Sequence, residues 1–238
     1  MAVTPAAGIG PVGRESTASI IAGRLRTAIG DGTLPPGSQL GEADLARRFD
    51  VSRGTLREAM QRLAAEGLLR GERHRGLFVR ELSSADVLDI YVTRNAIEQA
   101  AARLILRGDP LSVAAAAARL EEICAGMREA AGRGDHAAVA LGDARYHETL
   151  VRLSGSPRLA RVAGTLLIET RMCIRALQDS YPSRELPASR LREHDAILQA
   201  IRDGDEERVL ALIGAHMEAA AARLAPGLSL HGPRAPAP

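Results

Sequence analysis

The feature that most constrains this chain is a continuous series of segments with helical periodicity, from residue 84 to about residue 224. Apolar residues in these segments return every three or four positions, and no segment shows the alternation of a half-buried strand. Aromatic residues are scarce, with three Tyr, two Phe and no Trp, so the core must be built from aliphatic residues and Ala, which favour helices. An antiparallel all-α bundle is therefore expected. Its six helices are predicted over 84–107, 111–131, 135–154, 157–179, 187–203 and 205–224.

The residues before this series predict a smaller unit that also begins with helices. Ile21, Leu25 and Ile29 recur every four residues, as on the buried face of a helix that ends at Gly30. A second, short helix is expected over residues 42–49. A tight turn is expected at Asp50 and Val51, directly after this second helix.

A third helix and a hairpin complete this smaller unit. Ser52 is placed to cap a helix that runs from Arg53 to about Glu66, and Gly67 is placed to close it. Residues 68–79 then predict two short strands around a polar turn at 72–76. Helix, helix, tight turn, capped helix and hairpin is the order of a winged helix-turn-helix, whose second motif helix can enter the major groove of DNA.

The start of that helix carries side chains that suit DNA. Arg53 and Arg57 can bridge guanine or clamp phosphate, Thr55 can do either, and the basic hairpin tip at 73–76 can reach a neighbouring groove or the backbone. From Arg14 to Arg80 there are 12 Arg against 8 acidic residues, so the basic excess lies in this region. The alternative is that these arginines form only a solvated helix face.

Four segments follow from these patterns. A disordered lead (1–13), a winged helix-turn-helix domain (14–82), a helical domain (83–225) and a disordered tail (226–238) are expected. Cys124 and Cys173 lie far apart, and neither a signal peptide nor a bilayer-spanning stretch is found. A cytoplasmic protein without a membrane partner is therefore expected.

Three histidines and an aspartate are predicted to lie on the inward faces of three bundle helices. Asp143 and His147 are spaced i,i+4 on one helix, and His194 and His216 lie on the apolar stripes of two others. Buried polar groups need partners, and a divalent cation would satisfy all four. An Asp/His₃ set suits Zn²⁺, with Mn²⁺, Ni²⁺ or Fe²⁺ as alternatives. Periodicity does not show that these three helix faces meet, so a polar cluster without a metal is the alternative.

Arg94 is the candidate for holding an acidic ligand. It lies on an inward stripe between Tyr91 and Glu98, and a guanidinium can grip a carboxylate through two hydrogen bonds. The alternative is an ion pair with Glu98, one turn away on the same helix. Arg171 and Arg175 lie near the inner side of a later helix and are expected on its solvated flank.

The N-terminal motifs resemble those of the GntR family of bacterial regulators. The resemblance runs from about residue 18 to residue 80 and is carried by LPPGSQL (34–40), EADLA (42–46), VSRGTLREA (51–59), RLAAEGL (62–68) and RGLFV (75–79). It implies that Arg53, Thr55 and Arg57 contact the operator and that Gly76 forms the wing tip. Gly54 and Ala43 replace residues that other members use for contacts. The full set expected at DNA is Ser52, Arg53, Thr55, Arg57, Arg75 and Gly76.

The second part of the chain, over about 84–224, resembles the FCD ligand-binding domain of the FadR subgroup. The resemblance is carried by DARYH (143–147), Glu193 and His194, His216, and YVTR (91–94) with Glu98. It implies that Asp143, His147, His194 and His216 hold the metal and that an organic acid effector binds beside it.

These observations predict a ligand-responsive transcription regulator, expected to be a repressor, and not an enzyme. A homodimer on a pseudo-palindromic operator is expected, because one short recognition helix reads few base pairs. An Asp/His₃ metal with an open position could activate water. However, the sequence holds neither an HExxH motif nor an evident general base or nucleophile beside the cluster. A regulator with a metal-free histidine cluster is the other alternative.

Overall fold

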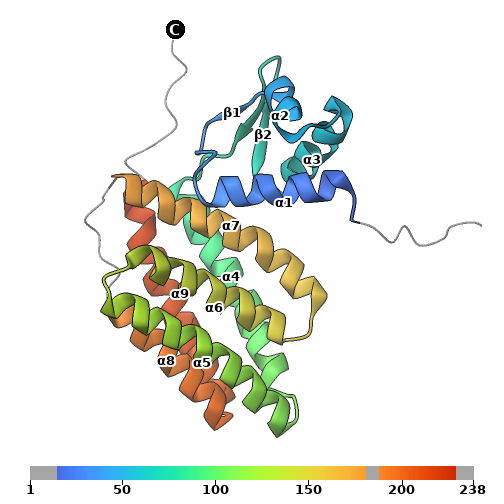
Figure 1. Cartoon of the computed structure of the whole chain (residues 1–238). Coiled ribbons are helices and arrows are strands. Elements are labelled where there is room, and N and C mark those ends of the chain that lie inside the picture. Colours follow the sequence, from blue (N-terminus) through green and yellow to red (C-terminus); the bar gives the residue numbers. More distant parts are fainter. Residues whose placement is uncertain (1–14, 181–187, 229–238) are drawn as a thin grey trace, which may run out of the picture.

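The computed structural model describes residues 15–180 and 188–228, and within these ranges the chain forms nine helices and three short strands. We call the part before residue 83 the head and the part after it the bundle (Figure 1). The head contains α1 (Thr17–Gly30), β1 (Gln39–Leu40), α2 (Glu42–Phe49), α3 (Arg53–Ala65), β2 (Leu69–Glu72) and β3 (Gly76–Val79). The bundle contains α4 (Ser84–Leu106), α5 (Pro110–Gly132), α6 (His136–Leu153), α7 (Pro157–Ser180), α8 (Ala188–Asp203) and α9 (Glu206–Leu228).

The head is a winged helix-turn-helix, which confirms the predicted fold class. Asp50 adopts the left-handed conformation, with a φ of 53°, and so makes the tight turn between α2 and α3. Leu56, Met60 and Leu63 form the fully buried stripe of α3. The antiparallel sheet has the order β1-β3-β2. Strand β1 was not predicted, because a strand of two residues carries no alternation that a sequence pattern can reveal.

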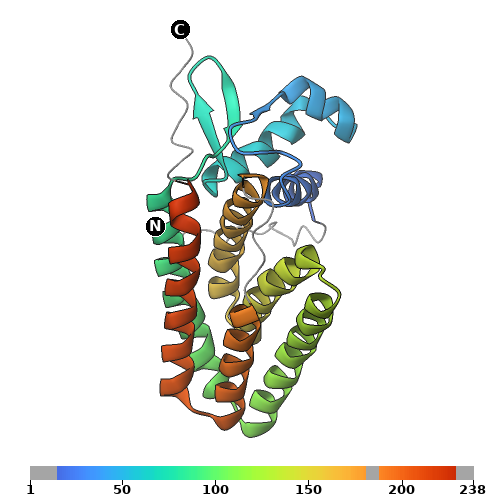
Figure 2. The same cartoon turned by 90° about the vertical axis from the view of Figure 1, so that its left-hand side faces the viewer.

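The bundle is all-helical, as predicted, and the helix ends follow local capping. Ser83 and Asp86 form a reciprocal capping box at the start of α4. Helices α4 and α9 lie side by side along their length (Figures 1 and 2). The last helix continues to Leu228, so the prediction of a tail from residue 226 was wrong at its first three residues. Pro226 is tolerated in this last turn because its missing N–H frees only one more carbonyl near a helix end. The predicted lead and the rest of the predicted tail lie outside the described residues.

Helix α7 belongs to both parts of the molecule. Ile168 and Met172 are buried in the apolar cluster of the head, whereas Cys173 packs in the cluster of the bundle. In Figure 1, α7 crosses beneath α1. Arg80, just after β3, forms an ion pair of 2.6 Å with Asp86 of α4 and lies 3.8 Å from Glu169 of α7. The head is therefore fixed to the bundle by shared apolar packing as well as by charge.

The contact between α5 and α6 depends on a glycine next to the predicted metal ligand Asp143. A Cβ added at Gly142 would lie 2.3 Å from Cγ of Met127, which is buried. Gly142→Ala is therefore expected to destabilise the protein by about 1–3 kcal/mol through overpacking. Gly126→Ala on α5 is the matched control, because nothing lies within 4 Å of its added Cβ. That change should be stabilising by about 0.5–1 kcal/mol. Equal melting temperatures for the two variants would contradict this packing.

Within the described residues, none of the helices combines the length and the apolar character needed to cross a bilayer.

Candidate metal centre and nucleic-acid interface

The four predicted metal ligands come together inside the bundle. Asp143 and His147 project from α6, His194 from α8 and His216 from α9, and all four side chains are buried. One ligand atom of each lies within 4.8 Å of the other three. Nε2 of His147 lies 3.4 Å from Nε2 of His194 and 3.1 Å from Nε2 of His216, and Asp143 Oδ1 lies 3.4 Å from Nε2 of His194. The open question of convergence is thus answered by the geometry.

The outer nitrogens of the rings fix which atoms face the centre. Each imidazole donates a hydrogen bond from Nδ1 to an acceptor outside the set of four. The acceptors are Glu98 Oε2 at 2.6 Å for His147, the Arg190 carbonyl at 2.7 Å for His194 and Glu193 Oε2 at 2.7 Å for His216. A neutral imidazole with its proton on Nδ1 presents a lone pair at Nε2. Three lone pairs and a carboxylate oxygen therefore point toward one another.

The electrostatics keep these four groups in the states that a metal ion requires. Burial lowers the pKa of His147, His194 and His216, so the rings are neutral at pH 7. Burial alone would raise the pKa of Asp143, but Arg190 and the histidines outweigh it and lower that pKa well below its usual range. Metal ligands must be deprotonated, so no proton has to leave before a cation can bind.

The donor set fits a divalent cation better than it fits a self-contained polar cluster. Nitrogen atoms 3.1 and 3.4 Å apart that both carry lone pairs repel each other, so these contacts are not hydrogen bonds. Zn–N bonds of about 2.0–2.1 Å put two ligands of a tetrahedral ion about 3.3 Å apart. The same imidazole and carboxylate set also accepts Mn²⁺, Ni²⁺ or Fe²⁺.

Arg94 is buried beside the centre and forms the pair that was considered as the alternative. Its Nε and Nη2 donate to Glu98 Oε1 at 3.0 and 2.9 Å, and its Nη1 lies 3.4 Å from Thr170 Oγ1. Glu98 thus joins Arg94 to His147. Burial opposes ionisation of Glu98, but His147 and Arg94 lower its pKa to about 2, so it is a carboxylate. Arg94 therefore helps to position the candidate ligand His147 through Glu98.

Arg190 is a site residue that sequence reasoning did not find. Its Nη2 donates to Asp143 Oδ1 at 2.8 Å, and its Nε is buried without a hydrogen-bond partner among the described residues. The hydroxyl of Tyr91 is also buried and also lacks a hydrogen-bond partner among the described residues. Arg190 lies one helical turn before His194, and that i,i+4 spacing was the available signal. Unpaired buried donors beside a cation site are what a bound anion would satisfy.

The predicted DNA-contacting residues lie at the exposed end of α3 and on the hairpin. Ser52 caps α3, since its Oγ accepts a hydrogen bond from the backbone N–H of Thr55 at 3.1 Å. Arg53 is exposed in the first turn of α3 and forms no ion pair with any residue that the structure describes. Its guanidinium is therefore available to an anionic partner.

Arg57 and Arg75 are exposed but already paired with acids of the head. Arg57 Nη2 lies 2.8 Å from Glu42 Oε2, and Arg75 Nη1 lies 2.6 Å from Glu72 Oε2. Gly76 is the first residue of β3, so residues 73–75 form the tip and the expectation of Gly76 at the tip was off by one residue. Gln39, which sequence reasoning did not single out, donates from Nε2 to the carbonyl of Arg75 at 2.5 Å and so braces the hairpin from β1.

Two family descriptions match this chain. "Bacterial regulatory proteins, gntR family" matches residues 17–79, and "FCD domain" matches residues 89–219. The two matches cover most of the head and the parts of the helices that carry the four candidate ligands.

Individual relatives are similar over most of their length. A Paenarthrobacter nicotinovorans protein named "Probable D-xylose utilization operon transcriptional repressor" is 30% identical over 82% of this chain and 82% of its own. The Bacillus subtilis HTH-type transcriptional regulator YdhC is 29% identical over 81% of this chain and 84% of its own. A solved structure of a GntR-type regulator from Rhodococcus sp. RHA1 is 29% identical, with a TM-score of 0.72, over 92% of this chain and 100% of that one.

Proposed function

Because this chain belongs to the GntR family and is a transcriptional regulator with an FCD effector-binding domain, we propose that it represses transcription as a metal-dependent homodimer on a pseudo-palindromic operator. Like its relatives, it acts as a transcriptional regulator and not as an enzyme. The effector is a small organic acid, and the site of action is the cytoplasm, where bacterial DNA is read. The head, up to residue 82, contacts DNA, and the bundle, from residue 83, binds the effector.

One observation carries the metal-dependent part of this proposal. The three Nε2 lone pairs and the Asp143 carboxylate are held face to face by outer hydrogen bonds, which is unfavourable unless a cation lies between them. Asp143, His147, His194 and His216 would hold that ion, with Zn²⁺ as the first choice. When bound, the ion would supply a Lewis-acidic position for a carboxylate oxygen.

The residues around the ligand set favour an acidic effector. Arg94 lies over the ring of Tyr91, with 5.0 Å from its Cζ to the ring centre, and Arg190 contacts Asp143. The unpaired donors of Tyr91 and Arg190 would hydrogen-bond to a carboxylate, and the Arg94 guanidinium would add charge. The function is tested by screening small organic acids for a rise in melting temperature, and then measuring operator binding with and without each hit. The proposal fails if no acid changes operator affinity.

The role of Arg94 can be tested with two variants. Arg94→Ala is expected to abolish the effector's influence on operator binding while the effector-free affinity stays nearly unchanged. Arg94→Lys keeps a charge beside Glu98 but loses the planar fork, so about tenfold more effector should be needed for the same response. Metal content of each variant is the control, because loss of Arg94 leaves Glu98 without a cation partner. If metal-loaded Arg94→Lys responds as the parent does, Arg94 only pairs with Glu98.

An exposed apolar stripe on α4 supports the proposed homodimer. Leu88 is 49% exposed and Val92 68% exposed, and Ala96 continues the stripe one turn further. Residues four apart lie on one face of a helix, so these side chains form a continuous surface next to the head. A two-fold contact along this stripe would set the spacing of two heads on the two half-sites.

Val92→Asp is expected to weaken dimerisation by at least about tenfold, because a carboxylate would be buried against its own copy. Leu111→Asp is the matched control, because Leu111 lies in the first turn of α5 and is 82% exposed. This change should leave the dimer intact. Sedimentation analysis of both variants across a concentration series measures the effect. If Val92→Asp stays dimeric wherever the parent is dimeric, the interface lies elsewhere.

A further inference from the structure

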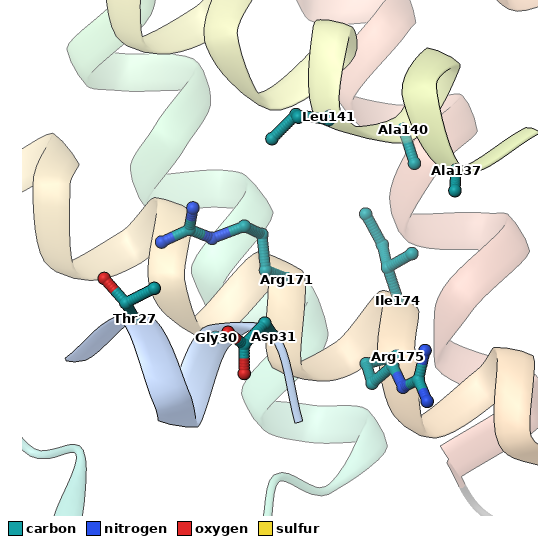
Figure 3. Close-up of a pocket in the computed structure, with 9 residues that line it drawn as sticks. All are labelled: Thr27, Gly30, Asp31, Ala137, Ala140, Leu141, Arg171, Ile174 and Arg175. Atoms are coloured by element: carbon teal, nitrogen blue, oxygen red, sulfur yellow. The ribbon is translucent and has the colours of Figure 1, made fainter. Parts of the chain in front are cut away.

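A cavity lies between the head and the bundle, away from the four residues proposed to bind the metal. Its volume is about 380 Å³, and it is lined by the end of α1, the first turns of α6 and the middle of α7. Figure 3 shows the side chains of Ala137, Ala140 and Leu141 directed from α6 toward α7, with Ile174 directed back toward them. None of the four metal ligands lines this space. Its size falls within the range of small-molecule sites.

The lining of this junction cavity combines an apolar side with two guanidinium groups. Arg171 and Arg175, one turn apart on α7, lie opposite one carboxylate, that of Asp31. Asp31 is engaged in its own turn, because its Oδ1 accepts a hydrogen bond from the backbone N–H of Thr33 at 2.9 Å. The lining therefore carries two guanidinium groups and one carboxylate next to apolar surface.

Gly30, the last residue of α1, and Gly32, just after it, make room for these arginines. A Cβ at Gly30 would lie 3.1 Å from Arg171 Nε, and a Cβ at Gly32 would lie 2.9 Å from Arg175 Cγ. Arg171 Nε is buried and has no hydrogen-bond partner in the described part of the chain. Both arginines were expected on a solvated flank. Arg175 is exposed, as expected, whereas Arg171 is only half-exposed because α1 of the head lies against it. A charged donor in this condition favours an anionic partner.

We propose that this junction cavity is a second ligand site, which binds a small organic carboxylate with an apolar body. The carboxylate accepts hydrogen bonds from Arg171, Arg175 adds positive charge, and the body packs on Ala140, Leu141 and Ile174. The site needs no metal ion. It goes beyond the proposed effector site, because its ligand touches the head directly through α1.

Such a ligand would influence the angle between head and bundle. Thr27, Gly30 and Asp31 come from the head, whereas the apolar side comes from α6, the helix that carries Asp143 one turn after Ala140. A ligand that bridges these elements favours one arrangement of the head over others.

The proposal is tested with 4-fluorobenzoate as the probe and fluorine NMR of the full chain as the readout. The parent protein should broaden the probe signal saturably, whereas neutral 4-fluorobenzamide should bind at least about tenfold more weakly. Arg171→Met keeps the length of the side chain without its charge and should weaken probe binding at least about tenfold. Ala140→Phe fills the cavity without changing either arginine and should have the same effect. Melting curves of all variants confirm that they are folded.

Two matched variants separate this site from others. Arg161→Met removes an exposed arginine of α7 outside the cavity and should bind the probe as the parent does. His194→Ala, which removes a proposed metal ligand, should also keep probe binding. If binding is lost in His194→Ala but kept in Arg171→Met, the probe occupies the metal centre and the junction site is refuted. Absence of saturable binding to the parent up to about 10 mM probe refutes it as well.

Discussion

Replacing His194 with alanine is expected to lower the affinity for Zn²⁺ by more than about 100-fold. Loss of a residue that only orients a ligand costs about 10–100-fold, and loss of the ligand itself should exceed that. The parent should purify with about one divalent ion per chain, or take one up from Zn²⁺, Mn²⁺ or Ni²⁺ near neutral pH. Since the ion binds the folded state, it should stabilise the parent by about 2.7 kcal/mol at a free concentration 100 times its Kd. His194→Ala should lose both metal content and this stabilisation.

The matched control for the metal centre is His136→Ala, which removes an exposed histidine at the start of α6. It should keep the metal and its melting temperature. Glu98→Gln removes the charge of the carboxylate that orients His147 at 2.6 Å, so its metal affinity should fall by about 10–100-fold. Elemental analysis and thermal melts with and without a chelator give all three results. A parent protein that binds no divalent ion under these conditions would overturn the metal centre.

The second large effect is expected at the recognition helix. Arg53→Ala should lose about 1–3 kcal/mol of operator binding and relax the preference for one base pair, because a bidentate contact to guanine is lost. The operator is obtained by selection from random DNA, and affinities are compared at the same salt concentration. Arg75→Ala should weaken binding more evenly across sequences, since a wing arginine that meets the phosphate backbone carries no base readout.

Arg133→Ala controls for the change in net charge. Arg133 lies in the bundle and pairs only with the exposed Glu129 of its own turn among the described residues, so operator binding should be unchanged. The ion pairs of Arg57 and Arg75 with Glu42 and Glu72 make Arg53 the sharper test. An Arg53→Ala variant that binds the operator as tightly as the parent would mean that another element enters the groove.

The helices and the four residues of the buried Asp/His₃ cluster could be predicted from sequence because both depend on local spacing. Ser52 and Ser83 indicated where two helices start. The i,i+4 spacing of Asp143 and His147 indicated that both lie on one face of a helix. Whether His194 and His216 would meet that pair depended on how α6, α8 and α9 pack. Periodicity gives the face of each helix but not the axial offset between helices, so convergence needed the structure.

The supporting residues were harder to predict because their partners lie far away in sequence. Glu98 binds His147 across 49 positions, and Gln39 binds the Arg75 carbonyl across 36. The pair of Arg94 and Glu98 could be considered as an alternative because the two residues are i,i+4 on one helix. The burial of the Arg171 Nε atom could not be foreseen, since it depends on the docking of α1 against α7.

The shared helix α7 restricts how this head can be exchanged with others. Ile168 and Met172 complete the apolar core of the head, although they lie more than 80 residues after it ends. A head grafted onto a foreign bundle would expose the surface that these two side chains cover, at about 1.5–3 kcal/mol for each. A functional exchange of heads would therefore have to include the face of α7 that carries Ile168 and Met172. The opposite face of α7, with Thr170 and Cys173, contacts the bundle, so its residues can change with the proposed effector without disturbing the core of the head.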